Sequence, residues 1–139
     1  MLHVSLKCQY AIKALVRLAA AQSGAPVQAR EIAEFGGIPV KFLEQVMHDL
    51  RTAGLVRSLR GKKGGYTLAR DPAQITFAAV IDVIEGSHGG AGRMPGDDQA
   101  QSLVEPVWQD VQRAVRDVLQ SATIAYAAAR AAAAPMYFI

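Results

Sequence analysis

Residues 31–70 read EIAEFGGIPVKFLEQVMHDLRTAGLVRSLRGKKGGYTLAR, and the order of patterns within this stretch decides the fold. Two short segments with helical spacing of apolar residues lie on either side of Gly36 and Gly37, where glycine permits a sharp turn. Two apolar, strand-like runs follow, separated by a basic glycine loop. This order predicts a winged helix-turn-helix, in which the helix pair fits a DNA major groove and the hairpin brings cations to the phosphates beside it.

The second helix of this pair, expected from about Pro39 to Ala53, is the candidate reading helix. Its core-facing residues follow a spacing of i, i+3, i+4 and i+7, with one aromatic residue beside them: Leu43, Val46, Met47, Leu50 and Phe42. Residues near the N-terminal end of such a helix reach base edges. The expected contacts are therefore the residues outside the apolar stripe, namely Val40, Lys41, Glu44, Gln45 and His48.

Three of these side chains have chemistry that suits base edges. Gln45 could pair with adenine at two points, Glu44 could accept a hydrogen bond from the cytosine amino group, and Lys41 could meet guanine or a phosphate. The alternative for Glu44 is an ion pair on the helix surface, for example with His48 or Arg51. Of the two, we expect base readout by Glu44.

A β hairpin is expected directly after the reading helix. LVRSL at 55–59 alternates apolar and polar residues like a half-buried strand, and residues 66–68 can return as its partner. The connecting loop, residues 60–65, holds three glycines and three cations, so it can approach a DNA backbone closely. A nucleotide-binding P-loop is improbable, because that motif ends in Gly-Lys-Ser or Gly-Lys-Thr and opens a helix. The expected DNA contacts of the hairpin are Arg57, Arg60, Gly61, Lys62, Lys63, Gly64 and Tyr66.

The charge distribution supports a polyanionic partner for the front of the chain. Residues 1–75 carry eleven Lys or Arg against five Asp or Glu, a net charge of +6, whereas residues 76–139 carry four against seven, a net charge of −3. No acidic residue occurs between Asp49 and Asp71, where six Lys or Arg fall. A field of this sign attracts nucleic acid, and binding should weaken steeply with salt. A solvated basic surface is the alternative.

A further helix is predicted before the pair, capped by Ser5 and running to about Gln22. Its apolar residues should pack beneath the reading head: Leu6, Tyr10, Ala14, Leu15, Leu18 and Ala19. Three basic side chains lie away from this stripe and could either touch the DNA backbone or remain solvated: Lys7, Lys13 and Arg17. In the short helix expected at 28–35, Ile32 and Ala33 should face inward.

The rear of the chain is predicted to join two copies. Thr76 can cap a short helix at 77–85, which completes a DNA-binding domain of residues 1–85. A flexible Gly-rich connection is expected at 86–101, a long dimerisation helix at 102–134 and an apolar tail at 135–139.

A heptad-like apolar seam follows the long helix. Pro106 sets the start of regular helix near Glu105, because a proline inside a helix deletes a hydrogen bond. The seam is too one-sided for a small monomer and predicts pairing across a homodimer, with packing inside one chain as the alternative. Its residues are Val104, Trp108, Val111, Val115, Val118, Ala122 and Ala125.

Composition excludes several classes of protein. The 139 residues suffice for one modest core and are 51% hydrophobic and 19% charged. They contain no apolar run of the roughly 18 residues that would span a bilayer, so a cytoplasmic protein without membrane contact is expected. An enzyme is not expected, because no nucleophile, base and orienting group occur at a recognisable spacing.

Three stretches together resemble one known family: SLKCQYAIKALVRLA at 5–19, residues 31–61, and GGYTLARDPAQIT at 64–76. This is the Rrf2 family of transcriptional regulators, which includes IscR, NsrR and CymR, and the resemblance covers most of residues 5–85. It implies a homodimeric transcription factor that binds a palindromic operator. By position it implies DNA contacts from Lys41, Phe42, Glu44, Arg60 and Gly61, among which Arg60 matches the wing arginine of the family most clearly.

The resemblance also implies a departure from the family in cofactor binding. Many members hold an iron–sulfur cluster through three cysteines in the segment after the fourth helix, where this chain has SHGGAGRMPGDDQAQSLVEPVW and no cysteine. Aligned on Trp108, Ser102 stands at the position of the last cysteine and Glu105 at that of a histidine ligand. A cluster normally needs four thiolate ligands, so we expect neither a cluster nor any other cofactor.

Two minor sites have competing interpretations. Cys8, the single cysteine, is expected to be a small packed residue, although Lys7 beside it could lower its pKa and make it a thiol sensor. His88, Asp97 and Asp98 could bind a metal, but a mobile loop is the simpler interpretation and no metal site is expected.

These observations predict a mainly α protein with a two-stranded wing and a long dimerisation helix. The expected function is transcriptional regulation, with repression by occlusion as the usual mode, through a palindrome whose half-sites lie about 10 base pairs apart. The alternatives are a protein-interaction module that kept the fold but lost DNA binding, and a thiol sensor acting through Cys8. Whether a small molecule or a protein acts as effector stays open.

Overall fold

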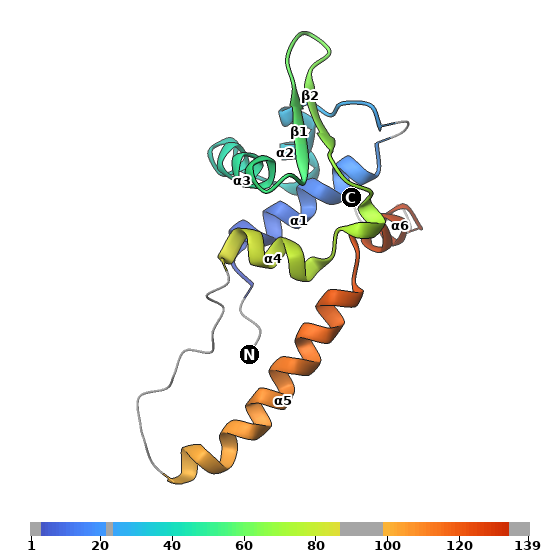
Figure 1. Ribbon diagram of the computed structural model, residues 1–139. Coiled ribbons are helices and arrows are strands. Elements are labelled where there is room, and N and C mark those ends of the chain that lie inside the picture. Colours follow the sequence, from blue (N-terminus) through green and yellow to red (C-terminus); the bar gives the residue numbers. More distant parts are fainter. Residues whose placement is uncertain (1–3, 22–23, 87–98, 134–139) are drawn as a thin grey trace.

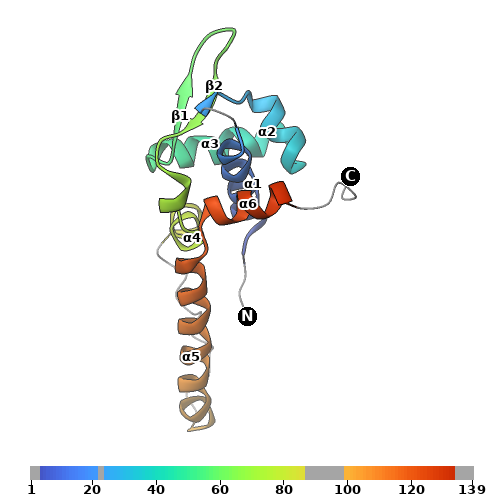
Figure 2. The same ribbon diagram turned by 90° about the vertical axis from the view of Figure 1, so that its right-hand side faces the viewer.

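The computed structural model describes residues 4–21, 24–86 and 99–133, and it confirms a mainly helical winged fold (Figure 1). Three helices form the head: α1 (Leu6–Ala19), α2 (Ala29–Gly36) and α3 (Val40–Thr52). The strands β1 (Val56–Leu59) and β2 (Gly65–Leu68) follow, and with their loop we call them the wing. The segment η2 (Pro72–Gln74) and helix α4 (Phe77–Glu85) complete the head, and α5 (Gln99–Ser121) and α6 (Ile124–Ala133) form the rear. The wing and α5 project from opposite sides of the head (Figures 1 and 2).

The core is built around α1, which contacts α2, α3, α4 and α6. The hydroxyl of Ser5 caps the helix by accepting from the backbone N–H of Cys8 at 3.1 Å, as predicted. The helix ends at Ala19, earlier than the predicted Gln22. Leu6 was wrongly placed in the inward stripe and is 57% exposed. Because several helices cover α1, burial extends to Cys8 and Ala11 instead.

The turn between α2 and α3 needs its two glycines for different reasons. Gly37 has φ +61°, a left-handed conformation that favours glycine. A side chain on Gly36 would meet the side chain of Ile38 at 2.8 Å. Ile32 is buried as predicted, but Ala33 is only half-buried.

In α3 the predicted core stripe is confirmed, because Leu43, Val46, Met47 and Leu50 are all buried. Phe42 differs from the prediction: it is 49% exposed, with its ring 6.2 Å from that of Tyr10. Pro39 occupies the N-cap position, so the helix begins at Val40.

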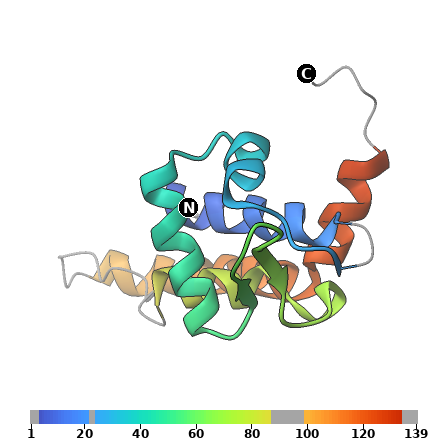
Figure 3. The ribbon, with the colours of Figure 1, turned by 90° about the horizontal axis from the view of Figure 1, so that it is seen from above.

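The wing is an antiparallel pair in which Arg57 lies opposite Thr67 and Ser58 opposite Tyr66. It is attached to the head by an isolated bridge between Val27 and Tyr66. Each of these two residues donates its N–H to the carbonyl of the other at 2.9 Å. Seen from above, the wing lies beside α3 on the face opposite α5 (Figure 3).

The predicted single helix at 102–134 is wrong in two respects. It begins earlier, at Gln99, with Pro106 inside the helix. This part of α5 is exposed, so water can satisfy the backbone carbonyl that the proline leaves without a donor. The helical run is also interrupted after Ser121, and α6 starts at Ile124.

The interruption has a clear cause in the packing of the head. The N–H of Phe77 donates to the carbonyl of Ala122 at 2.9 Å, and the N–H of Ile124 donates to the carbonyl of Ile75 at 2.9 Å. Thr123 then caps α6 by accepting from the N–H of Tyr126 at 3.1 Å. Ile124 is fully buried in the core, and the helix is interrupted where this side chain enters it.

Some predictions fall on residues outside the described ranges. These are most of the Gly-rich connection at 86–101, the metal-binding alternative at 88 and 97–98, and the tail at 135–139. Among the residues that the structure describes, none of the helices is both long and apolar enough to cross a membrane.

Candidate nucleic-acid interface

The α3 residues that were predicted to contact DNA all lie on the solvent-facing side of the helix. The opposite side of the helix is occupied by the buried apolar stripe, which leaves these side chains outward: Val40, Lys41, Phe42, Glu44, Gln45 and His48. None of the ion pairs within residues 4–21, 24–86 and 99–133 involves Glu44. The ion-pair alternative for Glu44 therefore has no support from the described contacts, and its carboxylate is free to accept from a base.

The N-terminal end of α3 is suited to approach a phosphate. Pro39 at the N-cap has no side chain that could accept from the first turn of the helix. Backbone N–H groups at such an end are left without partners inside the helix and carry a partial positive charge. This is the end of α3 from which Val40 and Lys41 project.

The loop of the wing carries cations on a tightly folded backbone. Arg57, Arg60, Lys62 and Lys63 are all exposed. Gly61 has φ +112° and open space around its α-carbon, so only its backbone conformation demands glycine.

At Gly64 and Gly65, which follow the cations of the loop, the protein's own backbone leaves no room for a side chain. A β-carbon on Gly64 would collide with the carbonyl oxygen of Leu59 and lie 2.9 Å from the carbonyl carbon of Arg60. Gly65 has φ +147°, and a β-carbon there would lie 2.7 Å from the carbonyl carbon of Val27. Gly65 thus lets the wing dock on the head, and half-buried Tyr66 completes that attachment through its bridge to Val27.

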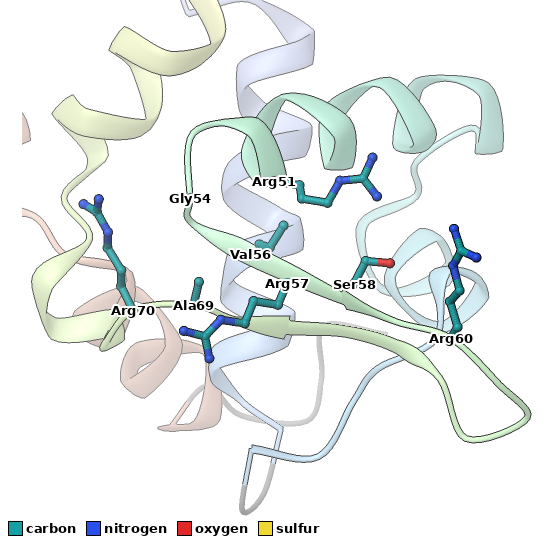
Figure 4. Close-up of a pocket in the computed structure, with 8 residues that line it drawn as sticks. All are labelled: Arg51, Gly54, Val56, Arg57, Ser58, Arg60, Ala69 and Arg70. Carbon is teal, nitrogen blue, oxygen red and sulfur yellow. The ribbon is translucent and has the colours of Figure 1, made fainter.

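A shallow hollow of about 690 Å³ lies between the end of α3 and the wing. Four arginines line it, and we call it the basic hollow: Arg51, Arg57, Arg60 and Arg70. Figure 4 shows Arg51 reaching from α3, Arg57 and Arg60 from the wing, and Arg70 from the segment after β2. Arg51 and Arg70 were not among the predicted contacts, although the acid-free stretch between Asp49 and Asp71 contained the signal.

The three cations of α1 do not join this surface. Lys7 pairs with Asp49 of α3 at 2.5 Å, and Arg17 approaches Glu31 of α2 at 3.5 Å. Lys13 donates to the carbonyl of Gly36, the last residue of α2, at 3.3 Å. All three side chains therefore connect α1 to the helix pair, which differs from both alternatives, contact with the DNA backbone and a solvated position.

The predicted dimerisation seam is exposed along α5. Val104, Trp108, Val111 and Val118 show between 45% and 67% of their surface in the single chain. Leu103 and Val107, which the heptad spacing missed, are also exposed and widen this apolar face. Contiguous apolar surface of this kind marks an interaction site.

The seam does not continue unbroken into α6. Val115 is half-buried within α5, whereas Ala122 lies at the interruption and Ala125 lies beyond it, where α6 runs in another direction (Figure 2). Ala127 and Ala128 of α6 pack against the core of their own chain. The apolar face available for a partner is therefore concentrated between residues 103 and 118.

Cys8 is confirmed as a packed residue. Its side chain is fully buried, and burial together with the nearby carboxylate of Glu85 raises the pKa of the thiol to about 11. Lys7, which could have lowered that pKa, is committed to Asp49. The described surroundings are thus opposite to those of a reactive thiolate.

The side chains also do not fit an iron–sulfur cluster. Such clusters take thiolate ligands, and the sequence has one cysteine, which is buried within α1. No group of three or more His, Cys, Asp or Glu side chains that could hold a metal ion occurs within the described ranges.

Comparisons with known proteins agree with this geometry. The profile of the family named Rrf2 and described as "Iron-dependent Transcriptional regulator" matches residues 4–130. The HTH-type transcriptional regulator CymR of Bacillus subtilis is 32% identical over 121 residues, which cover 87% of this chain and 86% of the relative.

Solved structures show the same relationship. The structure of CymR (YrzC), the global cysteine regulator of B. subtilis, superposes with a TM-score of 0.82 at 32% identity, covering 94% of this chain and 98% of that one. IscR of T. potens superposes with a TM-score of 0.76 at 37% identity, covering 94% and 88% of the two chains.

Proposed function

Since the chain belongs to the Rrf2 family of transcriptional regulators, we propose that it binds a palindromic operator as a homodimer and represses transcription by occlusion. It is a DNA-binding regulator and not an enzyme. The observation that carries the proposal is the continuity of the exposed side of α3 with a wing whose cations have no acidic partner among the described residues.

Sequence readout is assigned to the exposed side of α3. Lys41, Glu44 and Gln45 enter the major groove, where a well-placed two-point contact discriminates by about 1–3 kcal/mol per base pair. Arg60 and its neighbours in the wing contact phosphates or the adjacent minor groove, which positions the head without reading many bases. Phe42 offers an exposed ring for the methyl group of thymine.

Dimerisation is assigned to the apolar face of α5. A two-fold axis through paired α5 helices would relate two identical heads, and the operator would then be a palindrome with half-sites about 10 base pairs apart. The relative CymR comes from the bacterium Bacillus subtilis, whose DNA lies in the cytoplasm, and we assign the same site of action to this chain.

We propose further that this member works without an iron–sulfur cluster or other bound cofactor. The family is described as iron-dependent, but the one cysteine of this chain is buried with a raised pKa. The signal would then be a small molecule or a protein. Absorbance bands above the protein region in anaerobically purified protein, with stoichiometric iron, would contradict this assignment.

The DNA assignment is tested by fluorescence anisotropy with duplexes selected from a random pool. Arg60→Ala should weaken binding about tenfold and reduce the slope of log K against log salt by about one. Arg130→Ala removes the same charge from an exposed position on α6, where the side chain donates to the Tyr126 hydroxyl at 3.3 Å, and serves as the matched control. Glu44→Gln should relax base preference at one position and leave the salt slope unchanged. Absence of binding by the parent at low salt, or equal binding by Arg60→Ala, would refute the DNA assignment.

A further inference from the structure

The four arginines of the basic hollow have no acidic partner among the described residues, whereas three arginines elsewhere in the chain have one. Arg17, Arg113 and Arg116 each have a carboxylate partner. For Arg51, Arg57, Arg60 and Arg70, the part of the chain that the structure describes supplies no ion pair and no side-chain hydrogen bond. Like charges gathered on one surface repel each other unless an anion neutralises them. Guanidinium groups suit phosphate oxygens especially, because their N–H donors match them in pairs.

The floor of the hollow lets such a group come close. It consists of small residues, Gly54, Ser58 and Ala69, together with buried Val56. The base of the wing is fixed there, because the N–H of Ala69 donates to the carbonyl of Leu55 at 2.9 Å. A phosphate could therefore approach between the arginines without displacing a bulky side chain.

The hollow also lies where a DNA strand would pass if α3 reads the major groove. With its 13 residues, α3 is about 20 Å long, whereas the groove is about 12 Å wide. Arg51 is in the last turn, so it can reach the DNA backbone at one edge of the groove, while the side chains that read bases project from the other end of the helix. Arg57 and Arg60 are three residues apart in the extended part of the wing, so their side chains point to different sides and border the hollow at separate places (Figure 4).

We propose that the basic hollow is a phosphate site for the DNA backbone, and that Arg51 and Arg70 extend the contact surface from the wing tip to the end of α3. The inference rests on the proposed function, since it specifies how the same head holds duplex DNA. It is sequence-independent, because backbone phosphates are the same in every duplex.

The test uses the full chain and a random-sequence duplex of 40 base pairs, so no operator is needed. Arg51→Ala and Arg70→Ala should each lower the salt slope by about one and weaken binding about fivefold. In the double variant, which combines Arg51→Ala with Arg70→Ala, the salt slope should fall by about two. Arg51→Lys keeps the charge at the end of α3 but cannot form paired hydrogen bonds, so its slope should be preserved while its affinity falls slightly. Arg130→Ala is again the charge-matched control.

The outcomes separate this inference from the proposed function. If the parent binds no duplex at low salt, the proposed function fails and the inference with it. If the parent binds and Arg60→Ala reduces the slope while the Arg51 and Arg70 variants keep the parent slope, only the inference is overturned. The positive charge of Arg51 also stabilises α3, because it lies at the negative C-terminal end of the helix dipole. Loss of that effect alone would lower thermal stability without changing the salt slope.

A second arm identifies the source of the phosphate. Inorganic phosphate is titrated into the protein without DNA, with chloride at equal ionic strength as reference, and the arginine side-chain resonances are followed by NMR. Weak, non-saturating shifts together with the reduced slopes support the DNA backbone as the source. Saturating shifts at Arg51 and Arg70, with unchanged salt slopes in the variants, would overturn the assignment to DNA and leave a free-anion site.

Discussion

Replacing Gly65 by alanine should detach the wing from the head, and Gly61→Ala is the matched control. Both glycines have positive φ, +147° at Gly65 and +112° at Gly61. They differ in their surroundings, because nothing lies within 4 Å of a β-carbon on Gly61, whereas one on Gly65 would lie 2.7 Å from the carbonyl carbon of Val27. The comparison therefore separates backbone strain from collision with the head.

The magnitudes follow from these contacts. An alanine at positive φ lowers the free energy of unfolding by about 1–2 kcal/mol through backbone strain. The reduced conformational freedom of its unfolded chain raises it again by about 0.5–1 kcal/mol, so Gly61→Ala should be less stable than the parent by about 1 kcal/mol. In Gly65→Ala the clash also forces Val27 and Tyr66 apart and breaks the two hydrogen bonds between them, both 2.9 Å long. At about 1 kcal/mol each, they bring the expected loss to about 3 kcal/mol. The two variants should thus differ by roughly 30-fold in the equilibrium constant for unfolding.

Urea unfolding of the parent and both variants, at one protein concentration, measures these differences from the midpoints and slopes. Amide hydrogen exchange should show loss of protection at Val27 and Tyr66 in Gly65→Ala and near-parent protection in Gly61→Ala. Equal stability of the two variants, within about 0.5 kcal/mol, would refute the reasoning, because the Val27–Tyr66 bridge would then not hold the wing.

Three other predictions concern the rear of the chain and the core. Val111→Asp places a charge on the exposed apolar face of α5 and should convert the dimer to a monomer in sedimentation velocity. Gln109→Asp places the same charge at an exposed position outside the seam and should leave the dimer intact. Identical sedimentation of the two variants would count against α5 pairing. The thiol of Cys8 should resist iodoacetamide at pH 8 until urea unfolds the chain, because burial raises its pKa to about 11. Labelling of the folded protein at the rate of an exposed thiol would restore the sensor interpretation. Arg116 lowers the pKa of Asp82 by hydrogen bonding, so this carboxylate contributes stability above its unfolded pKa and loses it as the pH falls below about 4. Asp82→Asn should accordingly be slightly less stable than the parent at pH 6, and this difference should shrink as the pH falls. A difference independent of pH would exclude the ion pair as the cause.

The reading head could be predicted from the sequence because its determinants are local. The burial of Leu43, Val46, Met47 and Leu50 follows from their spacing on one helix. The turn and the wing follow from glycines and alternating residues within a few positions of each other. No contact with a distant segment was needed to place these elements.

The errors share a different cause, which is contact between residues far apart in the sequence. Lys7 was left without a structural role because its partner, Asp49, lies 42 residues away. The helix expected at 102–134 breaks because Ile124 enters the core beside Ile75, and periodicity within the helix contains no information about that neighbour. Likewise, Arg51 and Arg70 form one surface only when the end of α3 and the base of the wing come together.

The break between α5 and α6 gives the dimer its geometry if the α5 faces pair as proposed. Ile124 and the hydrogen bonds of Ala122 and Ile124 fasten the end of α5 to the head, and the carboxylate of Asp82 receives both terminal nitrogens of Arg116, at 2.8 and 2.7 Å. The apolar face runs from Val118, at this junction, to Leu103, along the helix that extends away from the head (Figure 1). The angle at which α5 leaves the head therefore fixes the separation of the two reading helices, and an uninterrupted helix would have placed the partner's head elsewhere. In a dimer paired through α5, the residues at this junction would therefore determine the spacing of the two half-sites.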